Sequence, residues 1–238
     1  MPAPVRLILV PGTRFSTLQW EPYRVLLPDV EVVPVDLPGH GTRLGQDFTS
    51  EAAVAVIAEA VAAGTPEQRV VVAGHSLGGF MAMLYAAHAT TQPDALVLLG
   101  ATADPSSPGA VFFRGFIKLL EIVGPDRMSR AMNRIMHLLG ARGDLKRSLP
   151  DGAAYAALPA AWEAVMAECR PQLLEELRCP VVLANGQYDQ MRAHVRRFAA
   201  HCQEAHVVTI RGATHLFPVT HPRQVTEVLG LGVRLAQG

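Results

Sequence analysis

The sequence predicts an α/β fold: a mostly parallel six-stranded sheet with helices on both faces and an inserted helical cap. Three observations lead to this fold class. Short β-branched runs alternate with helical patterns along most of the 238 residues, one run leads directly into a Gly-x-Ser-x-Gly pentapeptide, and the alternation stops between Asp104 and Leu177. Strands that alternate with helices form right-handed crossovers, which make neighbouring strands parallel. A chain of this length can bury the core of one such domain.

Six short apolar runs are the expected strands. Each is bounded by turn-forming or polar residues, as buried strands are. In chain order the runs cover residues 5–10, 30–35, 70–73, 95–99, 180–184 and 206–210.

Helical patterns separate these runs, and three of them have recognisable starts. Ser16 and Thr49 are candidate N-caps, and Pro222 suits a first helical position. The pattern directly after the pentapeptide is apolar nearly all round, which predicts a central, buried helix. The expected helices cover residues 15–27, 49–64, 77–89, 190–204 and 222–236.

Residues 104–177 break the alternation. This segment has several short helical patterns separated by glycine and proline, and it contains no convincing strand. We interpret it as a helical cap (lid) over the carboxyl ends of the strands. The predicted division is therefore a core of residues 1–103 and 178–238, with the cap of residues 104–177 inserted between them.

The charge composition gives no reason to expect nucleic acid or an anionic membrane surface as a partner, because 21 basic residues balance 21 acidic ones. No apolar run reaches the roughly 18 residues that span a bilayer. Three scattered cysteines, Cys169, Cys179 and Cys202, favour reduced thiols in a cytoplasmic protein. No residues have metal-ligand spacing and no glycine loop is of the phosphate-binding type, so we expect no metal and no cofactor. The oligomeric state stays open.

The pentapeptide runs from Gly74 to Gly78 and stands between a β-branched strand and an apolar helix. This is the context that a nucleophile elbow requires. Gly74 and Gly78 flank Ser76 because side chains at those positions would collide with the neighbouring strand and helix. The tight turn is expected to hold Ser76 at a positive φ and to expose its hydroxyl above the sheet.

Five segments, all in family order, make the chain resemble the α/β-hydrolase superfamily over nearly its whole length. They are Val10–Thr13, Asp36–Gly41, Gly74–Gly79, Asn185–Asp189 and Gly212–His215. The first half, especially residues 38–45, is also similar to the type II thioesterases of polyketide and peptide synthesis. Those proteins usually have arginine where this chain has His40.

The chain differs from larger members of the superfamily because it lacks the antiparallel hairpin before the first strand. The family's sheet order would then place residues 30–35 at an edge of the sheet. Pro34 is compatible with an edge strand because it donates no ladder hydrogen bond.

The resemblance implies a catalytic triad of Ser76, Asp189 and His215. A serine hydroxyl needs a base to take its proton during attack, and His215 follows the last strand, where the family places its histidine. Imidazole suits this role because it accepts and returns a proton near neutrality. Asp189 matches the family's acid, which orients the histidine and stabilises its charged form. Asp104, just after the fourth strand, is the alternative acid, because some members keep their acid there.

Two backbone N–H groups are the expected oxyanion-hole donors. One belongs to Leu77, at the start of the elbow helix, and the other to Thr13, which follows Pro11 and Gly12. The neighbouring Arg14 is expected at the surface, and contact with a substrate carboxylate is the alternative.

Three further polar residues have structural explanations. Asp36 and His40 are expected to hold the loop after the second strand. His75, inside the elbow motif, is expected to turn its side chain into the protein.

The cap is rich in phenylalanine and methionine at helical spacing. Packing of the cap on the core accounts for most of these residues. Even so, this composition favours an apolar, adaptable pocket roof over a polar one. The candidate pocket residues are Phe113, Phe116, Met132 and Met136.

Together these features predict a serine hydrolase that forms an acyl-enzyme on Ser76 and releases it to water. The expected substrates are small-molecule esters or thioesters with an apolar acyl or alcohol part. An acyltransferase would use the same residues with an alcohol or amine in place of water, and a carbon–carbon bond hydrolase or perhydrolase would use the same triad with a different pocket. The alternative from another class is a small-molecule binding protein on a hydrolase scaffold, because a fold does not determine function.

Overall fold

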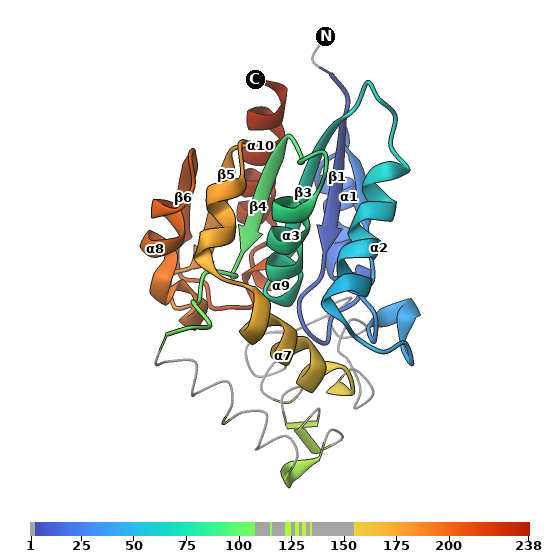
Figure 1. Ribbon diagram of the computed structural model, residues 1–238, viewed down its shortest axis with the longest axis vertical. Helices are drawn as coiled ribbons and strands as arrows, with labels where there is room; N and C mark the ends of the chain where they lie inside the picture. Colours follow the sequence, from blue (N-terminus) through green and yellow to red (C-terminus); the bar gives the residue numbers. More distant parts are fainter. Residues whose placement is uncertain are drawn as a thin grey trace.

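The computed structural model describes residues 3–107, 115, 122–124, 127–128, 130–131, 134 and 155–238. Six strands form one sheet in the order β2-β1-β3-β4-β5-β6, and every neighbouring pair is parallel (Figure 1). The predicted fold class is therefore confirmed, and the strand that contains Pro34 lies at an edge. The strands are β1 (Val5–Val10), β2 (Glu31–Pro34), β3 (Arg69–His75), β4 (Ala95–Leu99), β5 (Val181–Gly186) and β6 (Ala205–Ile210).

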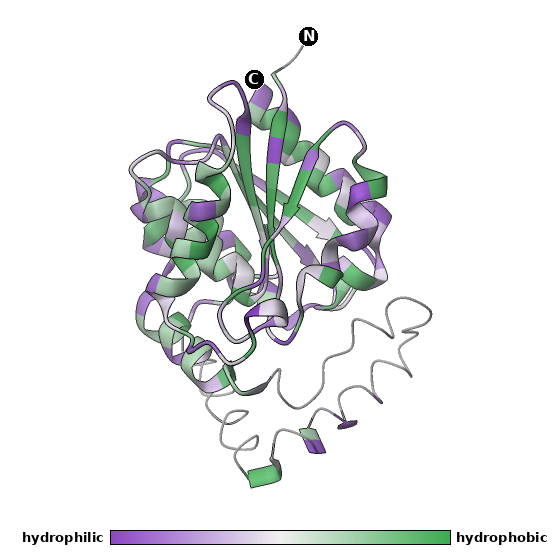
Figure 2. Ribbon diagram, turned by 90° about the vertical axis from the view of Figure 1, so that its right-hand side faces the viewer, coloured by the Kyte–Doolittle hydropathy of each residue, from purple (hydrophilic) through white to green (hydrophobic). Residues whose placement is uncertain are grey.

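Side chains of the central strands alternate between the two faces of the sheet. β1 and β3 pair with Leu7 beside Val71 and Ile8 beside Val72. The first pair belongs to the apolar cluster on one face and the second pair to the cluster on the other face. Figure 2 shows the strands as a largely hydrophobic layer inside the molecule. Burial of both faces explains why these strands are near-continuous apolar runs in the sequence.

Helices cover both faces of this sheet (Figure 1). Residues of α2 (Ser50–Ala62), α3 (Leu77–His88) and α8 (Val195–Ala200) pack in one cluster. Residues of α1 (Glu21–Leu26) and α10 (Pro222–Gln237), with those of the short α9 (Phe217–Thr220), pack in the other. All residues of α3 from Leu77 to Ala86 are buried, as its apolar pattern predicts.

The predicted helix starts hold in the structure. The Ser16 side chain accepts a hydrogen bond from the N–H of Leu18, and the Thr49 hydroxyl accepts one from the N–H of Ala52. Pro222 is the first residue of α10. These positions satisfy or remove donors that a helix start would leave unpaired.

Two predicted helices are shorter and more irregular than expected. Residues 15–27 divide into a 3₁₀ helix, Thr17–Trp20, and α1, which has Pro22 in its first turn. Proline has no N–H to bond back into a preceding helical turn, so the α-helix starts there. Residues 190–204 likewise begin as a 3₁₀ helix, Gln190–His194, before α8.

The described end of the predicted cap contains α7 (Leu158–Glu168) and a 3₁₀ helix (Pro171–Glu176), and α7 lies beyond the carboxyl ends of the strands (Figure 1). Ala161 and Val165 of α7 pack in the same apolar cluster as α3. The Ser50 hydroxyl donates a hydrogen bond to Glu168 Oε1 at 2.6 Å. This end of the segment is thus packed directly on the core.

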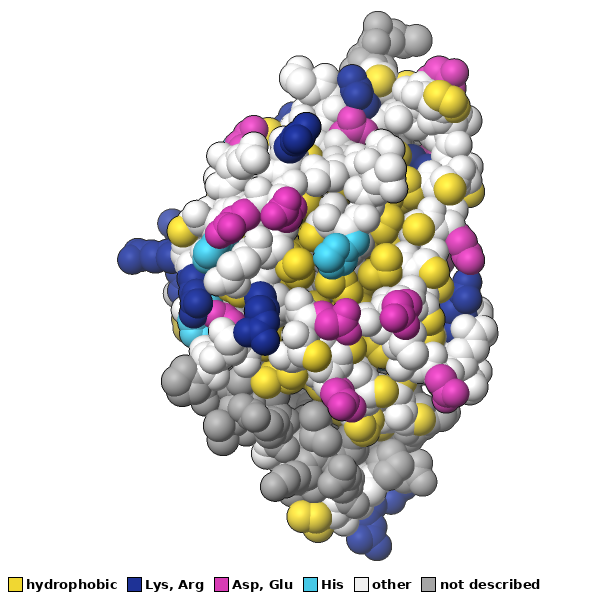
Figure 3. All heavy atoms as spheres, in the orientation of Figure 1, with side chains coloured by type: hydrophobic (Ala, Val, Ile, Leu, Met, Phe, Trp, Pro, Cys, Tyr) yellow, Lys and Arg dark blue, Asp and Glu magenta, His cyan; other side chains and the backbone are white. Residues whose placement is uncertain are grey.

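The distribution of surface charge and the state of the cysteines follow the expectations from the sequence. On the face that Figure 3 shows, acidic and basic side chains are interspersed. Cys169, Cys179 and Cys202 are free thiols, as predicted. None of the helices in the described ranges is both long and apolar enough to cross a membrane.

Candidate active site

Ser76 lies in the sharp turn between β3 and α3. Its backbone has φ 52° and ψ −117°, which is a rare conformation for a residue with a side chain. A Cβ atom at Gly74 would collide with the Gly78 carbonyl, and one at Gly78 would collide with the Val10 carbonyl. Both glycines are therefore required by close approach of the backbone, for the reason that the motif suggests.

The structure brings Ser76, Asp189 and His215 together. His215 Nε2 lies 3.0 Å from Ser76 Oγ, and His215 Nδ1 lies 2.9 Å from Asp189 Oδ1. With the Nδ1 proton donated to the carboxylate, Nε2 is the acceptor that faces the serine hydroxyl. The Asp189 side chain is fully buried and that of His215 is 20% exposed. The His215 ring thus connects the Ser76 hydroxyl to a fully buried carboxylate.

Asp189 is held as a carboxylate. Its Oδ1 also accepts a hydrogen bond from the N–H of Met191 at 2.8 Å. Burial by itself raises the pKa of Asp189, but the hydrogen bond and charge of His215, with the Met191 N–H, together keep this pKa below its ordinary value. The buried group therefore retains the negative charge that a neighbouring imidazolium requires.

Asp104, the alternative acid, contacts Arg197 and Ser106, and in the described part of the chain it does not contact His215. Its carboxylate lies 2.6 Å from the Arg197 guanidinium and accepts hydrogen bonds from the N–H and hydroxyl of Ser106. No contact between Asp104 and His215 is present among the described residues. The structure therefore favours Asp189 as the partner of the histidine.

Gly100 is a site residue that the sequence analysis missed. It follows β4 and has φ 63°. A Cβ atom at this position would lie 3.0 Å from His215 Cε1 and 3.1 Å from Asp189 Oδ2. Gly100 therefore leaves the space in which the carboxylate and the imidazole meet.

His75 is buried and contacts the loop that carries His215. Its Nε2 lies 3.0 Å from the backbone carbonyl of His215, and its Nδ1 lies 3.2 Å from Gln19 Nε2. Gln19 Oε1 in turn accepts a hydrogen bond from the N–H of Gly12 at 3.1 Å. The inward orientation of His75 was predicted, but this connection between two loops was not.

The protonation state of His75 follows from these partners. The Gln19 amide donates to Nδ1, so the proton of the neutral ring is on Nε2 and is donated to the His215 carbonyl. Burial, aided by the nearby His215 ring, lowers the pKa of His75 to about 3. His75 is therefore neutral across the range in which an imidazole base works.

The two expected oxyanion donors come from the elbow helix and from the loop after β1. Leu77 is the first residue of α3, whose N-terminus carries positive helix-dipole potential. Thr13 follows Gly12, and a Cβ atom at Gly12 would lie 2.6 Å from His75 Nδ1. Among the described hydrogen bonds none uses the N–H of Leu77 or of Thr13. Both groups thus remain able to donate to a substrate oxygen.

The loop after β2 is held as predicted. Asp36 accepts hydrogen bonds from the N–H of Thr17 at 2.7 Å and from the N–H and hydroxyl of Thr42 at 2.8 and 2.9 Å. His40 is buried, and its Nδ1 bonds to the Pro38 carbonyl. These contacts stabilise loops beside the site and give neither residue a place in the triad.

Arg14 departs from its expected position at the surface. Its side chain is partly buried and donates a hydrogen bond to the hydroxyl of Tyr155 at 2.7 Å. The guanidinium lies 5.0 Å from the centre of the tyrosine ring. The four candidate pocket residues of the cap, Phe113, Phe116, Met132 and Met136, lie outside the described residues.

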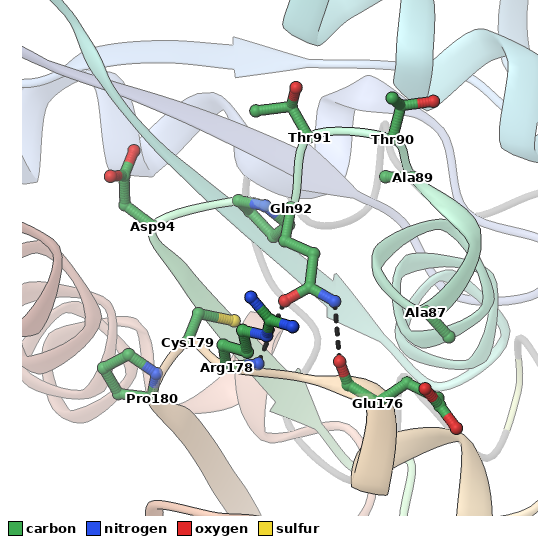
Figure 4. Close-up of a pocket in the computed structure, with 11 residues that line it drawn as sticks. Ala87, Ala89, Thr90, Thr91, Gln92, Asp94, Glu176, Arg178, Cys179 and Pro180 are labelled. Atoms are coloured by element: carbon green, nitrogen blue, oxygen red, sulfur yellow. Dashed lines mark hydrogen bonds between the residues drawn. The ribbon is translucent and has the colours of Figure 1, made fainter.

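A separate hollow of about 740 Å³ lies at the opposite, amino end of the strands (Figure 4). The Gln92 side chain bridges its walls, donating to the Glu176 carbonyl and accepting from the Arg178 N–H. No triad residue lines this hollow. Within the described ranges no group of three His, Cys, Asp or Glu side chains is placed to hold a metal ion.

Solved structures share this fold along essentially the whole chain. A thermophilic esterase from Thermogutta terrifontis is 22% identical with a TM-score of 0.78, and the match covers 100% of this chain and 92% of that one. MenH from S. aureus is 14% identical with a TM-score of 0.83, covering 100% and 96%. The enol-lactonase from Burkholderia xenovorans is 18% identical with a TM-score of 0.69, covering 97% and 92%. At these identities the similarity shows the fold.

The sequence comparisons place the chain in a family. None of the curated proteins compared with it matches significantly. The model of the alpha/beta hydrolase family matches residues 7–228, a range that includes the elbow, Asp189 and His215. The chain therefore belongs to the alpha/beta hydrolase family.

Proposed function

We propose that this protein is a serine hydrolase that cleaves carboxylic esters or thioesters through an acyl-enzyme on Ser76. The observation that carries the proposal is the position of His215, whose two ring nitrogens lie within hydrogen-bonding distance of Ser76 Oγ and Asp189 Oδ1. This geometry is what general-base activation of a serine hydroxyl requires.

In the first step, Ser76 Oγ attacks the substrate carbonyl carbon while His215 Nε2 takes the hydroxyl proton. The imidazolium that forms is stabilised by the buried Asp189 carboxylate. Negative charge develops on the carbonyl oxygen, and the N–H groups of Leu77 and Thr13, which make no hydrogen bond among the described residues, are the proposed donors to it. Donors that are already oriented stabilise this charge without reorganisation.

The tetrahedral intermediate then collapses. His215 gives its proton to the leaving alcohol or thiol, and the acyl group remains bonded to Ser76. A water molecule repeats the attack with His215 as base, and the acid product leaves. An acyltransferase would differ only in this second half, where an alcohol or amine would replace water.

The apolar character of the substrate is inferred from the cap. Phenylalanine and methionine at helical spacing favour an adaptable apolar roof. Among the described residues of the cap segment, Met128, Tyr155 and Leu158 form a buried apolar cluster. The names of the neighbours from Thermogutta terrifontis and Burkholderia xenovorans, an esterase and an enol-lactonase, support ester-type bonds as the targets.

The proposal is tested with a fluorophosphonate probe and p-nitrophenyl esters of graded acyl length. We expect the wild-type protein to be labelled on Ser76 and to turn over these esters. Ser76→Ala should lose both properties while its thermal unfolding temperature stays close to that of the wild type. A folded wild-type protein that is neither labelled nor active would contradict the acyl-enzyme. Matched thioesters and an added acceptor alcohol separate esterase, thioesterase and transferase activity.

A further inference from the structure

Arg14 has an unusual backbone conformation. Among the described residues only Arg14 and Ser76 have a positive φ without being glycine, and the value at Arg14 is 71°. Such a conformation is strained, and it persists where the surroundings over-determine it, often at functional sites. Arg14 directly follows Thr13, whose N–H is the proposed second oxyanion donor.

The guanidinium of Arg14 is held in one place by Tyr155. Its Nη1 donates to the phenol oxygen at 2.7 Å, and its carbon lies 5.0 Å from the ring centre. Tyr155 is itself only 2% exposed and packs against Met128 and Leu158. The cation is therefore held between Tyr155 of the cap segment and the loop after β1, which also carries Thr13.

The positive charge of Arg14 has no carboxylate partner in the described part of the chain. Arg6, a buried arginine, has the usual opposite charge beside it, because it forms an ion pair with Glu31. Tyr155 supplies Arg14 with one neutral acceptor, while an arginine has five N–H donors. Holding a cation away from water without an opposite charge is unfavourable, so an anion that reaches it would be bound strongly.

A second polar group at the same place also lacks a partner. The Thr13 hydroxyl is buried and accepts or donates no hydrogen bond among the described residues. Buried polar atoms without partners are rare in folded proteins. The loop therefore presents an unpaired hydroxyl and an unpaired cation on consecutive residues.

We propose that Arg14 binds a carboxylate of the substrate, so that the preferred substrates carry a carboxylate within a few bonds of the scissile carbonyl. The inference rests on the proposed acyl-enzyme function and names a class of substrate for it. The carboxylate could belong to the acyl part, as in a half ester of a dicarboxylic acid, or to the alcohol part, as in the ester of a hydroxy acid. An apolar chain with a charged end fits both Arg14 and the apolar pocket roof that the composition of the cap predicts.

The test compares matched pairs of esters that differ only in charge. In the acyl arm, an aryl half ester of glutaric acid is compared with the same ester of its neutral half amide. In the alcohol arm, the butyrate ester of glycolic acid is compared with that of glycolamide. We expect the wild type to have a higher kcat/KM for the charged member in one arm, and that arm identifies the part of the substrate that Arg14 binds.

Arg14→Gln should lower kcat/KM for the charged ester by about 10- to 100-fold, the loss expected for one charge-assisted hydrogen-bonding group. It should change kcat/KM for the neutral ester of the same pair less than about threefold. Arg14→Lys should recover part of the preference for the charged ester. Arg234→Gln, at an exposed position in the last turn of α10, is the charge-matched control and should leave the charged-to-neutral ratio unchanged.

Three other results would each overturn the inference, and they can be told apart. If Arg14 only ties the loop to the cap, Arg14→Gln and Tyr155→Phe will lower kcat/KM for charged and neutral esters by the same factor, and the inference is wrong. Equal wild-type activity on both members of both pairs, with Ser76 labelled by fluorophosphonate, overturns the inference and leaves the proposed function standing. Absence of both labelling and turnover overturns both.

Discussion

The Nε2 atom of His75 lies 3.0 Å from the backbone carbonyl of His215, so the residue before Ser76 also supports the loop that carries His215. The two rings are 4.9 Å apart between their centres. Through Gln19, the same imidazole is connected to the N–H of Gly12 in the loop that carries Thr13. One buried chain of hydrogen bonds thus joins the base and the proposed oxyanion loop.

The first prediction concerns Gln19. Gln19→Met keeps the length of the side chain but removes both hydrogen bonds, leaving His75 Nδ1 and the Gly12 N–H unpaired in the interior. We expect the free energy of unfolding to fall by about 1–3 kcal/mol and kcat on p-nitrophenyl butyrate to fall by roughly tenfold, because a small displacement of the base is costly. Urea unfolding and steady-state kinetics measure the two effects.

The control for this variant is Gln203→Met at an exposed position. It makes the same chemical change and should alter neither quantity. If Gln19→Met loses stability as expected but keeps the kcat of the wild type, the hydrogen-bond chain supports the fold and does not position His215.

The second prediction separates the two candidate acids. Asp189→Asn removes the charge that stabilises the His215 imidazolium and disturbs its tautomer, so kcat should fall by about 10⁴-fold, as it does when a triad aspartate is replaced. Asp104→Asn weakens the contact with Arg197, which is half exposed, so a small loss of stability and near-normal kcat are expected. If Asp104→Asn were the inactive variant, our choice of acid would be incorrect.

The third prediction is a pH dependence of stability. The pKa of His75 is about 3 in the folded chain and about 6.5 when unfolded. Between these values the unfolded state binds the proton and the folded state does not, so acidification destabilises the fold. His75 should contribute a slope of up to about 1.4 kcal/mol per pH unit, with stability lost as pH falls from about 6.5 toward 3.

Urea unfolding at pH 6.5, 5.5 and 4.5 measures this slope. His75→Gln keeps a hydrogen-bonding side chain that does not titrate, so the variant should be less stable at neutral pH and less sensitive to acid. Parallel curves for wild type and variant would show that His75 is not the titrating group. Asp189, whose pKa is lowered, begins to lose its stabilising contribution only as pH falls to about 4, the unfolded value for aspartate, which is below the three pH values of this experiment.

The fourth prediction concerns Gly100. In Gly100→Ala the new methyl group would press on the His215 ring and on Asp189 Oδ2, so kcat should fall by at least about tenfold while KM changes little. Gly45→Ala is the matched control, since Gly45 also has a positive φ, 84°, but has open space around its Cβ position. Both variants should lose about 1 kcal/mol of stability, and only Gly100→Ala should lose activity.

Local features of the sequence were sufficient to predict the parallel sheet and the tight turn at Ser76. Buried parallel strands need apolar side chains on both faces, and that need is visible in each short run. The conformation of Ser76 was predictable because the collisions that require Gly74 and Gly78 arise within a few residues of the turn. The helix over residues 15–27 was predicted as one continuous element, although Pro22 is a local reason for the α-helix to start anew after a 3₁₀ turn.

Local sequence patterns therefore specified the fold class and the tight turn at Ser76, and the family resemblance added the edge position of β2. The choice of acid that contacts His215, the space that Gly100 leaves for that contact, and the contacts of His75 and Arg14 arise only when the chain folds. His75 and His215 are 140 residues apart in the chain, and Arg14 and Tyr155 are 141 apart. Backbone sterics act between neighbours and leave a pattern in the sequence, whereas such distant side-chain pairs depend on how the whole core packs.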